Sequence, residues 1–300
     1  MINWIPIKSL NSLFLPRKNT WMNKLSFTLL FSFVLFTKSL QAQYYYKDIL
    51  SNKQLVADMA ILKQQKIRTV VVHSFEPDDQ PSEGFFCEKK ISKDYRKIVT
   101  YSKSAETNKS ILTTYFNEKG LLIKTVDSSE LNTSSSDFVY DTSGNIITST
   151  SISHSSDEDF SNSLTEVHQY IYNDSGYLQK MFRIKNQKDT TEIDFLHDAK
   201  GNIIDEIEVA QYGNHYYYYY DDQNRLTDIV RYNIVKGKPL PDFIFEYNEE
   251  GQLAQMVATD EGVTANYFLW RYVYDGTLRI KEKCYSKDKK LQGYIEYEYK

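Results

Sequence analysis

The sequence predicts a mainly β protein in which tandem antiparallel β-hairpin repeats form a long twisted meander sheet, preceded by a short N-terminal helix. Three observations predict this fold class. A turn motif recurs along the chain, apolar residues alternate with polar ones on both sides of each turn, and 25 of the 300 residues are tyrosine. Alternation with a period of two places every second side chain on the same face of a sheet.

The turn motif reads aromatic residue, Asp or Asn, two polar residues, Gly, any residue, and then Leu or Ile. Its copies occupy residues 116–122, 140–146, 172–178, 197–203, 220–226 and 247–253, with a shortened copy at 274–278. Successive Gly positions, with Asn224 taken as the fifth, are separated by 24, 32, 25, 23 and 27 residues. This spacing suits one hairpin and its return connection.

Each position of the motif has a physical role. Asp or Asn bonds its own downstream backbone, and Gly supplies the left-handed conformation that closes a type I turn with a bulge. The aromatic residue then lies opposite the aliphatic one, which predicts the pairs Tyr140–Ile146, Tyr172–Leu178, Tyr220–Leu226 and Tyr247–Leu253. Rings two positions earlier extend the same face into a ladder: Phe138, Tyr170, Phe195, Tyr218, Phe245 and Tyr272. The opposite face is mixed in polarity, so a partly covered or folded-over sheet is the alternative.

The first 42 residues carry five basic residues and no acidic one. Within them Lys24 precedes the apolar run 25–36, and the small residue Ala42 follows. This order is typical of a secretory signal peptide, and the run is shorter than the roughly 20 residues of a membrane span. A single-pass anchor is the alternative. The predicted divisions are a mis-called upstream extension at 1–21, a signal peptide at 22–42, an N-terminal cap helix and first hairpin at 43–92, and the hairpin repeat array at 93–300.

Three segments outside the repeats have their own patterns. Apolar residues at helical spacing predict a helix over 47–66, which would cover one end of the sheet because terminal repeats need a cap. Strands are expected at 69–75 and 85–91, with a turn between them. Residues 151–163, rich in Ser and acidic residues, are expected to form a mobile loop.

Composition limits the partners and the compartment. Without residues 1–42, which hold five of the 36 basic residues, 31 basic residues face 40 acidic ones, a net charge of −9. This excess repels nucleic acid and anionic lipid, so we expect no nucleic-acid binding and no membrane insertion of the mature chain. An oxidising compartment would allow Cys87 and Cys284 to pair. They lie near opposite ends of a linear array, which would hold them beyond the roughly 7 Å between Cα atoms that a disulfide allows, so a disulfide is the alternative to two free thiols.

The copies at 140–146 and 220–226, Tyr-Asp-Thr-Ser-Gly-Asn-Ile and Tyr-Asp-Asp-Gln-Asn-Arg-Leu, resemble the YD-repeat, or RHS, family of bacterial secreted and surface proteins. The resemblance covers about residues 112–280. It implies a β-hairpin array on an exported protein, often a shell, stalk or scaffold. Large members form a cocoon around a toxin and cleave themselves at an acidic Pro-Gly-containing motif. This chain is far shorter and has no such motif, so no catalytic residue is carried over.

The histidines give no sign of catalytic or metal chemistry. None of the five, His73, His154, His168, His197 and His215, stands in a metal-binding or hydrolase motif. His197 occupies the aromatic position of its repeat, which is a structural position. We therefore expect no enzyme activity, no metal and no cofactor.

The tyrosines are the chemically suggestive feature. Within residues 216–220, all tyrosine, alternate rings join the ladder, whereas Tyr217 and Tyr219 point to the other face, with Tyr219 opposite Thr227. Exposed tyrosine rings can contact a partner protein or stack on a glycan. The bland alternative is that these rings simply pack.

These observations predict an exported protein, periplasmic, on the cell surface or secreted, that acts as a non-enzymatic repeat scaffold or binding module. Its partner would be an unidentified protein or glycan. The alternative function is a cell-wall or glycan-binding repeat protein that uses the exposed Tyr217 and Tyr219, and an uncharacterised enzyme ranks below both.

Overall fold

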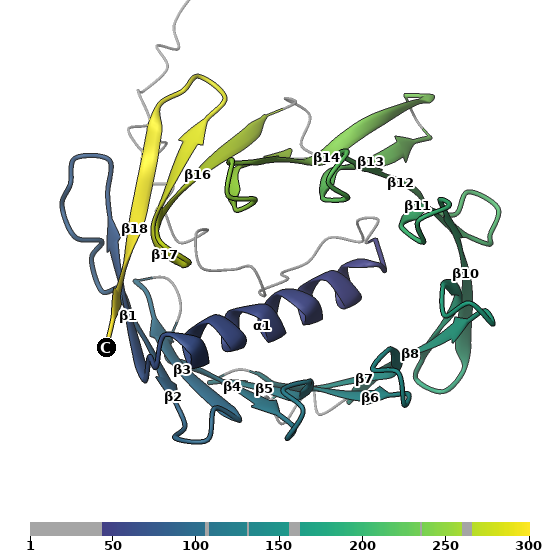
Figure 1. The fold of residues 1–300 in the computed structure, drawn as a ribbon, viewed down its shortest axis with the longest axis horizontal. Coiled ribbons are helices and arrows are strands. Elements are labelled where there is room, and N and C mark those ends of the chain that lie inside the picture. Colours follow the sequence, from purple (N-terminus) through teal and green to yellow (C-terminus); the bar gives the residue numbers. More distant parts are fainter. Residues whose placement is uncertain (1–43, 106–107, 131, 156–162, 235, 260–265) are drawn as a thin grey trace, which may run out of the picture.

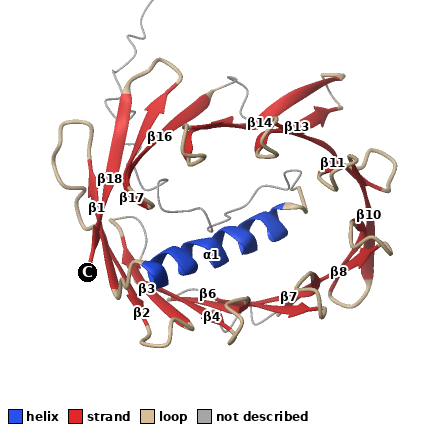
Figure 2. Ribbon diagram, viewed as in Figure 1, coloured by secondary structure: helices blue, strands red, loops and turns tan. Residues whose placement is uncertain are grey.

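The residues that the structure describes form a closed antiparallel β-barrel of 18 strands with one helix inside it (Figures 1 and 2). This computed structural model describes residues 44–105, 108–130, 132–155, 163–234, 236–259 and 266–300. The predicted extension and signal peptide lie outside the described residues. The elements are α1 (Lys47–Gln64), β1 (Thr69–Phe75), β2 (Phe86–Ile91), β3 (Lys97–Lys103), β4 (Ser110–Phe116), β5 (Leu122–Ser129), β6 (Asn132–Tyr140), β7 (Ile146–Ser155), β8 (Leu164–Tyr172), β9 (Leu178–Lys185), β10 (Asp189–His197), β11 (Ile203–Glu208), β12 (His215–Tyr220), β13 (Leu226–Asn233), β14 (Lys238–Tyr247), β15 (Leu253–Thr259), β16 (Tyr267–Asp275), β17 (Leu278–Ser286) and β18 (Leu291–Tyr299).

The predicted hairpins are confirmed by the strand register. The aromatic and aliphatic residues of each repeat are paired as expected, in Tyr140–Ile146, Tyr172–Leu178, Tyr220–Leu226 and Tyr247–Leu253, and a bulge adjoins each pair. Gly144 has a φ of 88° and Asn224 a φ of 66°, so both adopt the left-handed conformation that the turn requires. In each turn the first Asp or Asn accepts a hydrogen bond from the backbone N–H four residues later, at positions 117, 141, 173, 198, 221 and 248.

In the five copies of the motif that begin with tyrosine, this residue also bonds its hairpin to the preceding one. Its hydroxyl donates to the backbone carbonyl of the aliphatic residue one repeat earlier, in Tyr140–Leu122, Tyr172–Ile146, Tyr220–Ile203, Tyr247–Leu226 and Tyr274–Leu253, at 2.5–3.0 Å. These bonds explain why the position holds tyrosine more often than phenylalanine. His197 takes the same position in its repeat, and its ring lies 4.8 Å from that of Tyr177.

The predicted open meander sheet is wrong, because the sheet closes on itself. Strand β1 pairs with β2 on one side and with β18 on the other, from Val70↔Tyr299 to Phe75↔Tyr294. Bulges bend and twist the strands that carry them, and repeated bending curls a long sheet. Closure also leaves neither terminal strand with an unpaired edge, which is costly in an open sheet.

Helix α1 lies inside the closed sheet, along the inner face of the early strands (Figure 1). Its first part packs with the aromatic ladder, including Tyr170, Phe195 and Tyr218, all at most 5% exposed. Its second part packs through Met59 and Leu62 onto residues of β1 to β5. Because the sheet is closed, it has no terminal repeat that needs a cap. The helix instead fills part of the barrel interior.

Two other expectations are changed by the strand layout. Strand β7 extends to Ser155, so the predicted loop is wrong for residues 151–155, and residues 156–162 lie outside the described residues. The two ends of the array are adjacent, whereas a linear array was expected to hold them, and with them the two cysteines, far apart. Cys87 and Cys284 are nevertheless buried and unpaired, on β2 and β17. These strands are separated by β1 and β18, about 14 Å at the usual strand spacing.

The described chain contains no helix that is long and apolar enough to cross a membrane.

Candidate functional site

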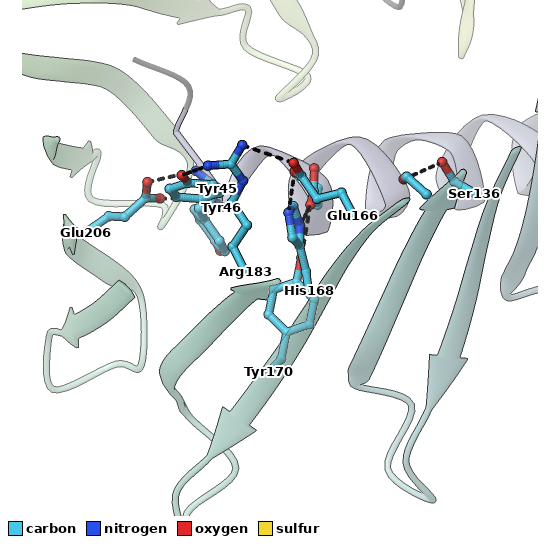
Figure 3. A network of polar contacts seen from close by, with 10 residues as sticks. Tyr45, Tyr46, Ser136, Glu166, His168, Tyr170, Arg183 and Glu206 are labelled. Carbon is cyan, nitrogen blue, oxygen red and sulfur yellow. Dashed lines mark hydrogen bonds and ion pairs between the residues drawn. The ribbon is translucent and has the colours of Figure 1, made fainter. Parts of the chain in front are cut away.

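A cluster of ionisable side chains lies inside the barrel, where the start of α1 meets β8, β9, β11 and β12 (Figure 3). The wall supplies Glu166 and His168 from β8, Arg183 from β9 and Glu206 from β11. Strand alternation places these side chains on the same inner face as the aromatic ladder. The helix side supplies the backbone of residues 45–46 and the carboxylate of Asp48.

Glu206 caps the start of the helix. One of its carboxylate oxygens accepts a hydrogen bond from the backbone N–H of Tyr45 at 2.7 Å, and the other accepts from that of Tyr46 at 2.9 Å. The Tyr218 hydroxyl donates a third hydrogen bond at 2.7 Å. Tyr45 and Tyr46 lie just before α1, and a carboxylate at the N-terminal end of a helix is also favoured by the helix dipole. Glu206 is only 1% exposed, and this burial raises its pKa to about 7 although the three donors oppose the rise.

His168 lies between two carboxylates. Its Nδ1 is 2.6 Å from an oxygen of Asp48 on the helix, and its Nε2 is 2.8 Å from an oxygen of Glu166 on its own strand. Burial lowers the pKa of His168, but the hydrogen bonds and charges of the two carboxylates outweigh burial and raise it to about 9. Burial raises the pKa of Glu166, and His168 and Arg183 reverse this effect and hold it at about 2.

Arg183 and Tyr170 complete the cluster. The Arg183 guanidinium contacts Glu166 at 3.0 Å and donates to the Tyr45 hydroxyl at 3.3 Å, while Tyr170 donates to Asp48 at 3.1 Å. Each wall side chain thus bonds either the start of α1 or a residue that does so. The cluster holds acids, a base and phenols, and these groups are used to attach the helix to the wall. Within the described ranges, no three or more His, Cys, Asp or Glu side chains are grouped to hold a metal ion.

The two tyrosines singled out from the sequence lie elsewhere, on the outer face of β12. Tyr216 and Tyr218 are buried, whereas Tyr219 is 52% exposed and Tyr217 is partly exposed, so the predicted division between faces is confirmed. The ring of Tyr217 lies 4.3 Å from that of His215. A bulge between Tyr219 and Tyr220 shifts the register, so that Asp228, and not Thr227, lies opposite Tyr219.

The inner cluster was missed at the level of sequence, although a signal for it exists. In β8, Glu166 and His168 occupy the same alternating face as the buried Tyr170. In β11, Glu206 lies on the same face as Tyr216, its cross-strand partner. Charged residues on a face that is otherwise aromatic must find buried partners. The partner is the helix start, which could not be placed without knowing that the sheet closes around it.

No family model and no curated protein matches the sequence. Among solved structures, the chain is similar to a porin-like protein from Bacteroides uniformis, with 10% identity over 78% of this chain and 98% of that one and a TM-score of 0.36. It is also similar to TcdB2-TccC3-TEV, at 12% identity over 72% of this chain and 12% of that one, with a TM-score of 0.32. A third is the Photorhabdus luminescens Tc holotoxin pore with mutated TccC3, at 12% identity, 73% and 16% coverage, and a TM-score of 0.28. Likenesses this weak carry no functional argument, and membership of the YD-repeat family stays a prediction.

Proposed function

We propose that this chain is an exported, non-enzymatic scaffold or binding module of the cell envelope or exterior. The proposal rests on one observation: the polar side chains of the repeats and of the inner cluster form hydrogen bonds and ion pairs that hold the fold together. The repeat tyrosines bond their hydroxyls to neighbouring hairpins, and the inner ionisable cluster bonds its groups to α1. Both sets of contacts stiffen the fold. The signal-like order of residues 22–42 supports export.

The outer face of β12 and β13 is the contact surface that we favour. Tyr219 is 52% exposed and Tyr232 is 37% exposed, and Tyr217 is partly exposed on the same face. Rigid rings that need little ordering are well suited to binding. Asp228 lies opposite Tyr219 and offers a carboxylate beside the ring. This combination favours a glycan as the second candidate partner, because rings stack on sugar faces and carboxylates accept hydrogen bonds from hydroxyl groups.

The export part of the proposal predicts the mature N-terminus. Protein recovered from the native host should be found in the envelope or the medium and should begin near Gln43, because the leader is removed after translocation. Cell fractionation followed by N-terminal sequencing and intact-mass measurement checks this. Recovery of the chain from the cytoplasm would contradict export, and an envelope form that keeps residues 22–42 would instead establish an anchor.

The glycan alternative predicts binding that depends on Tyr217 and Tyr219. The wild-type barrel should co-sediment with purified peptidoglycan sacculi, and the Tyr217→Ala/Tyr219→Ala variant should bind at least about tenfold more weakly, a loss of about 1.4 kcal/mol. Tyr101→Ala is the matched control, because Tyr101 is an exposed tyrosine on the distant strand β3. Equal loss in the control, or no binding by the wild type, would leave a protein as the partner class.

A further inference from the structure

Helix α1 is attached to the barrel wall unevenly along its length. The buried side chains of the helix are Ile49, Asn52, Met59 and Leu62. A mostly polar face remains exposed inside the closed sheet, at residues 53, 54, 58, 63 and 64 together with the alanines at 57 and 60. Both halves pack on apolar residues of the wall, but the first turn is in addition held by charged groups and hydrogen bonds. An attachment through charged groups depends on the protonation of its members.

The geometry around His168 requires a protonated ring. Both ring nitrogens lie within hydrogen-bond distance of carboxylate oxygens, Nδ1 with Asp48 and Nε2 with Glu166. A carboxylate oxygen only accepts, so both nitrogens must donate, and only the imidazolium form carries two N–H groups. A neutral ring has one N–H group, and its other nitrogen would place a lone pair against a carboxylate.

The two carboxylates differ in what remains to hold them after His168 loses its proton. Glu166 keeps Arg183 at 3.0 Å and has Lys185 at 3.7 Å, both on the wall. Asp48 keeps the hydroxyl of Tyr170 at 3.1 Å. After deprotonation, the contacts that hold Asp48 of the helix to the wall are therefore weaker than those that hold Glu166 within the wall. Deprotonation therefore weakens the attachment of α1 more than the wall itself.

The other groups around the ring do not replace the lost charge. From the helix side, Lys47 adjoins Asp48, and the Tyr45 ring meets the His168 ring edge-on at 5.8 Å. From β11, Glu206 adds a negative group beside the same turn. Burial lowers the pKa of Lys47 to about 8, although Asp48 and Glu166 oppose this, so Lys47 loses its charge over much the same range.

We propose that His168 is a proton-controlled latch that docks the start of α1 on β8 and β9, and that the first half of α1 leaves the wall when His168 is deprotonated. The ordinary pKa of histidine is about 6.5. Because the pKa of His168 is raised to about 9 in the folded protein, docking is strongest below about pH 6.5 and is lost as the pH rises through about 9. This device is independent of which partner the barrel binds.

Hydrogen exchange of the full chain followed by mass spectrometry tests the latch between pH 6 and pH 10, after correction for the intrinsic rate. We expect the protection of residues 47–56 to fall at least about tenfold between pH 6.5 and 9 while β12 and β13 stay protected. His168→Gln should remove this fall. His215→Gln is the matched control, because His215 also lies beside a carboxylate, Asp205 at 2.5 Å, but on the outer face, away from α1. Parallel loss of protection in helix and strands, or a fall that persists in His168→Gln, would overturn the proposal.

A second measurement covers the case in which His168→Gln does not fold. In the wild-type protein, the ring signals of His168 can be followed by nuclear magnetic resonance as the pH is raised. We expect His168 to titrate well above the ordinary histidine range, together with the loss of helix protection. Titration in the ordinary range, or separately from the loss of protection, would overturn the latch.

Discussion

Tyr172→Ala should destabilise the barrel by about 3–5 kcal/mol, by analogy with the removal of other large aromatic side chains from a core. Tyr172 faces the inside opposite Leu178 and packs against the cluster that surrounds the first part of α1. Its hydroxyl also donates to the carbonyl of Ile146 at 3.0 Å, so the substitution removes both ring packing and a bond between neighbouring hairpins. Urea unfolding, followed by tyrosine fluorescence and circular dichroism, measures the loss.

Tyr219→Ala is the matched control for this substitution. Tyr219 comes from an equivalent strand, but its side chain lies on the outer face and is 52% exposed. Its removal should change the free energy of unfolding by less than about 1 kcal/mol, as is usual for an exposed position. If both variants lose the same stability, the outer face is covered in solution, and the proposed contact through Tyr217 and Tyr219 fails with it.

The local features of the fold were predictable because they are encoded within each repeat. A turn residue, a glycine and one aromatic–aliphatic pair determine a hairpin and its register, and Tyr247–Leu253 is paired as the pattern requires. The division of Tyr216 to Tyr220 between two faces followed from alternation alone. The expected partner of Tyr219 was wrong by one residue, Thr227 in place of Asp228. The cause is a bulge, which adds a residue to one strand and shifts every pair beyond it.

Closure was not predictable from the repeats, because it depends on contacts between the two ends of the chain. The sequence holds a clue in the two strands that lack a repeat partner, Thr69–Phe75 and Leu291–Tyr299. Each would be an exposed edge in an open sheet, and in the barrel they pair with each other. The inner cluster depends on this closure, since Glu206 and Tyr45 are 161 residues apart in sequence and meet only inside the ring.

Glu206→Ala should cost about 3 kcal/mol or more, because each buried donor left without an acceptor costs about 1–3 kcal/mol. The substitution leaves the N–H groups of Tyr45 and Tyr46 and the hydroxyl of Tyr218 without their acceptor, in a place with almost no access to water. Tyr218→Phe removes a single donor and keeps the ring, so its cost should be nearer to about 1 kcal/mol. Glu246→Ala, at an exposed glutamate on β14, should be close to neutral.

Glu206→Gln separates the charge of this group from its shape. Since the pKa of Glu206 is raised from 4.5 to about 7, the folded wild-type protein binds an extra proton between these values, and its stability should fall as the pH rises through this window. An amide side chain does not titrate, so the variant should lose that slope, while the separate slope from His168 between about pH 6.5 and 9 remains. Urea unfolding of both proteins from pH 4 to 7 makes the comparison. An unchanged slope in Glu206→Gln, or a Glu206→Ala variant as stable as Glu246→Ala, would mean that this carboxylate does not hold the helix start.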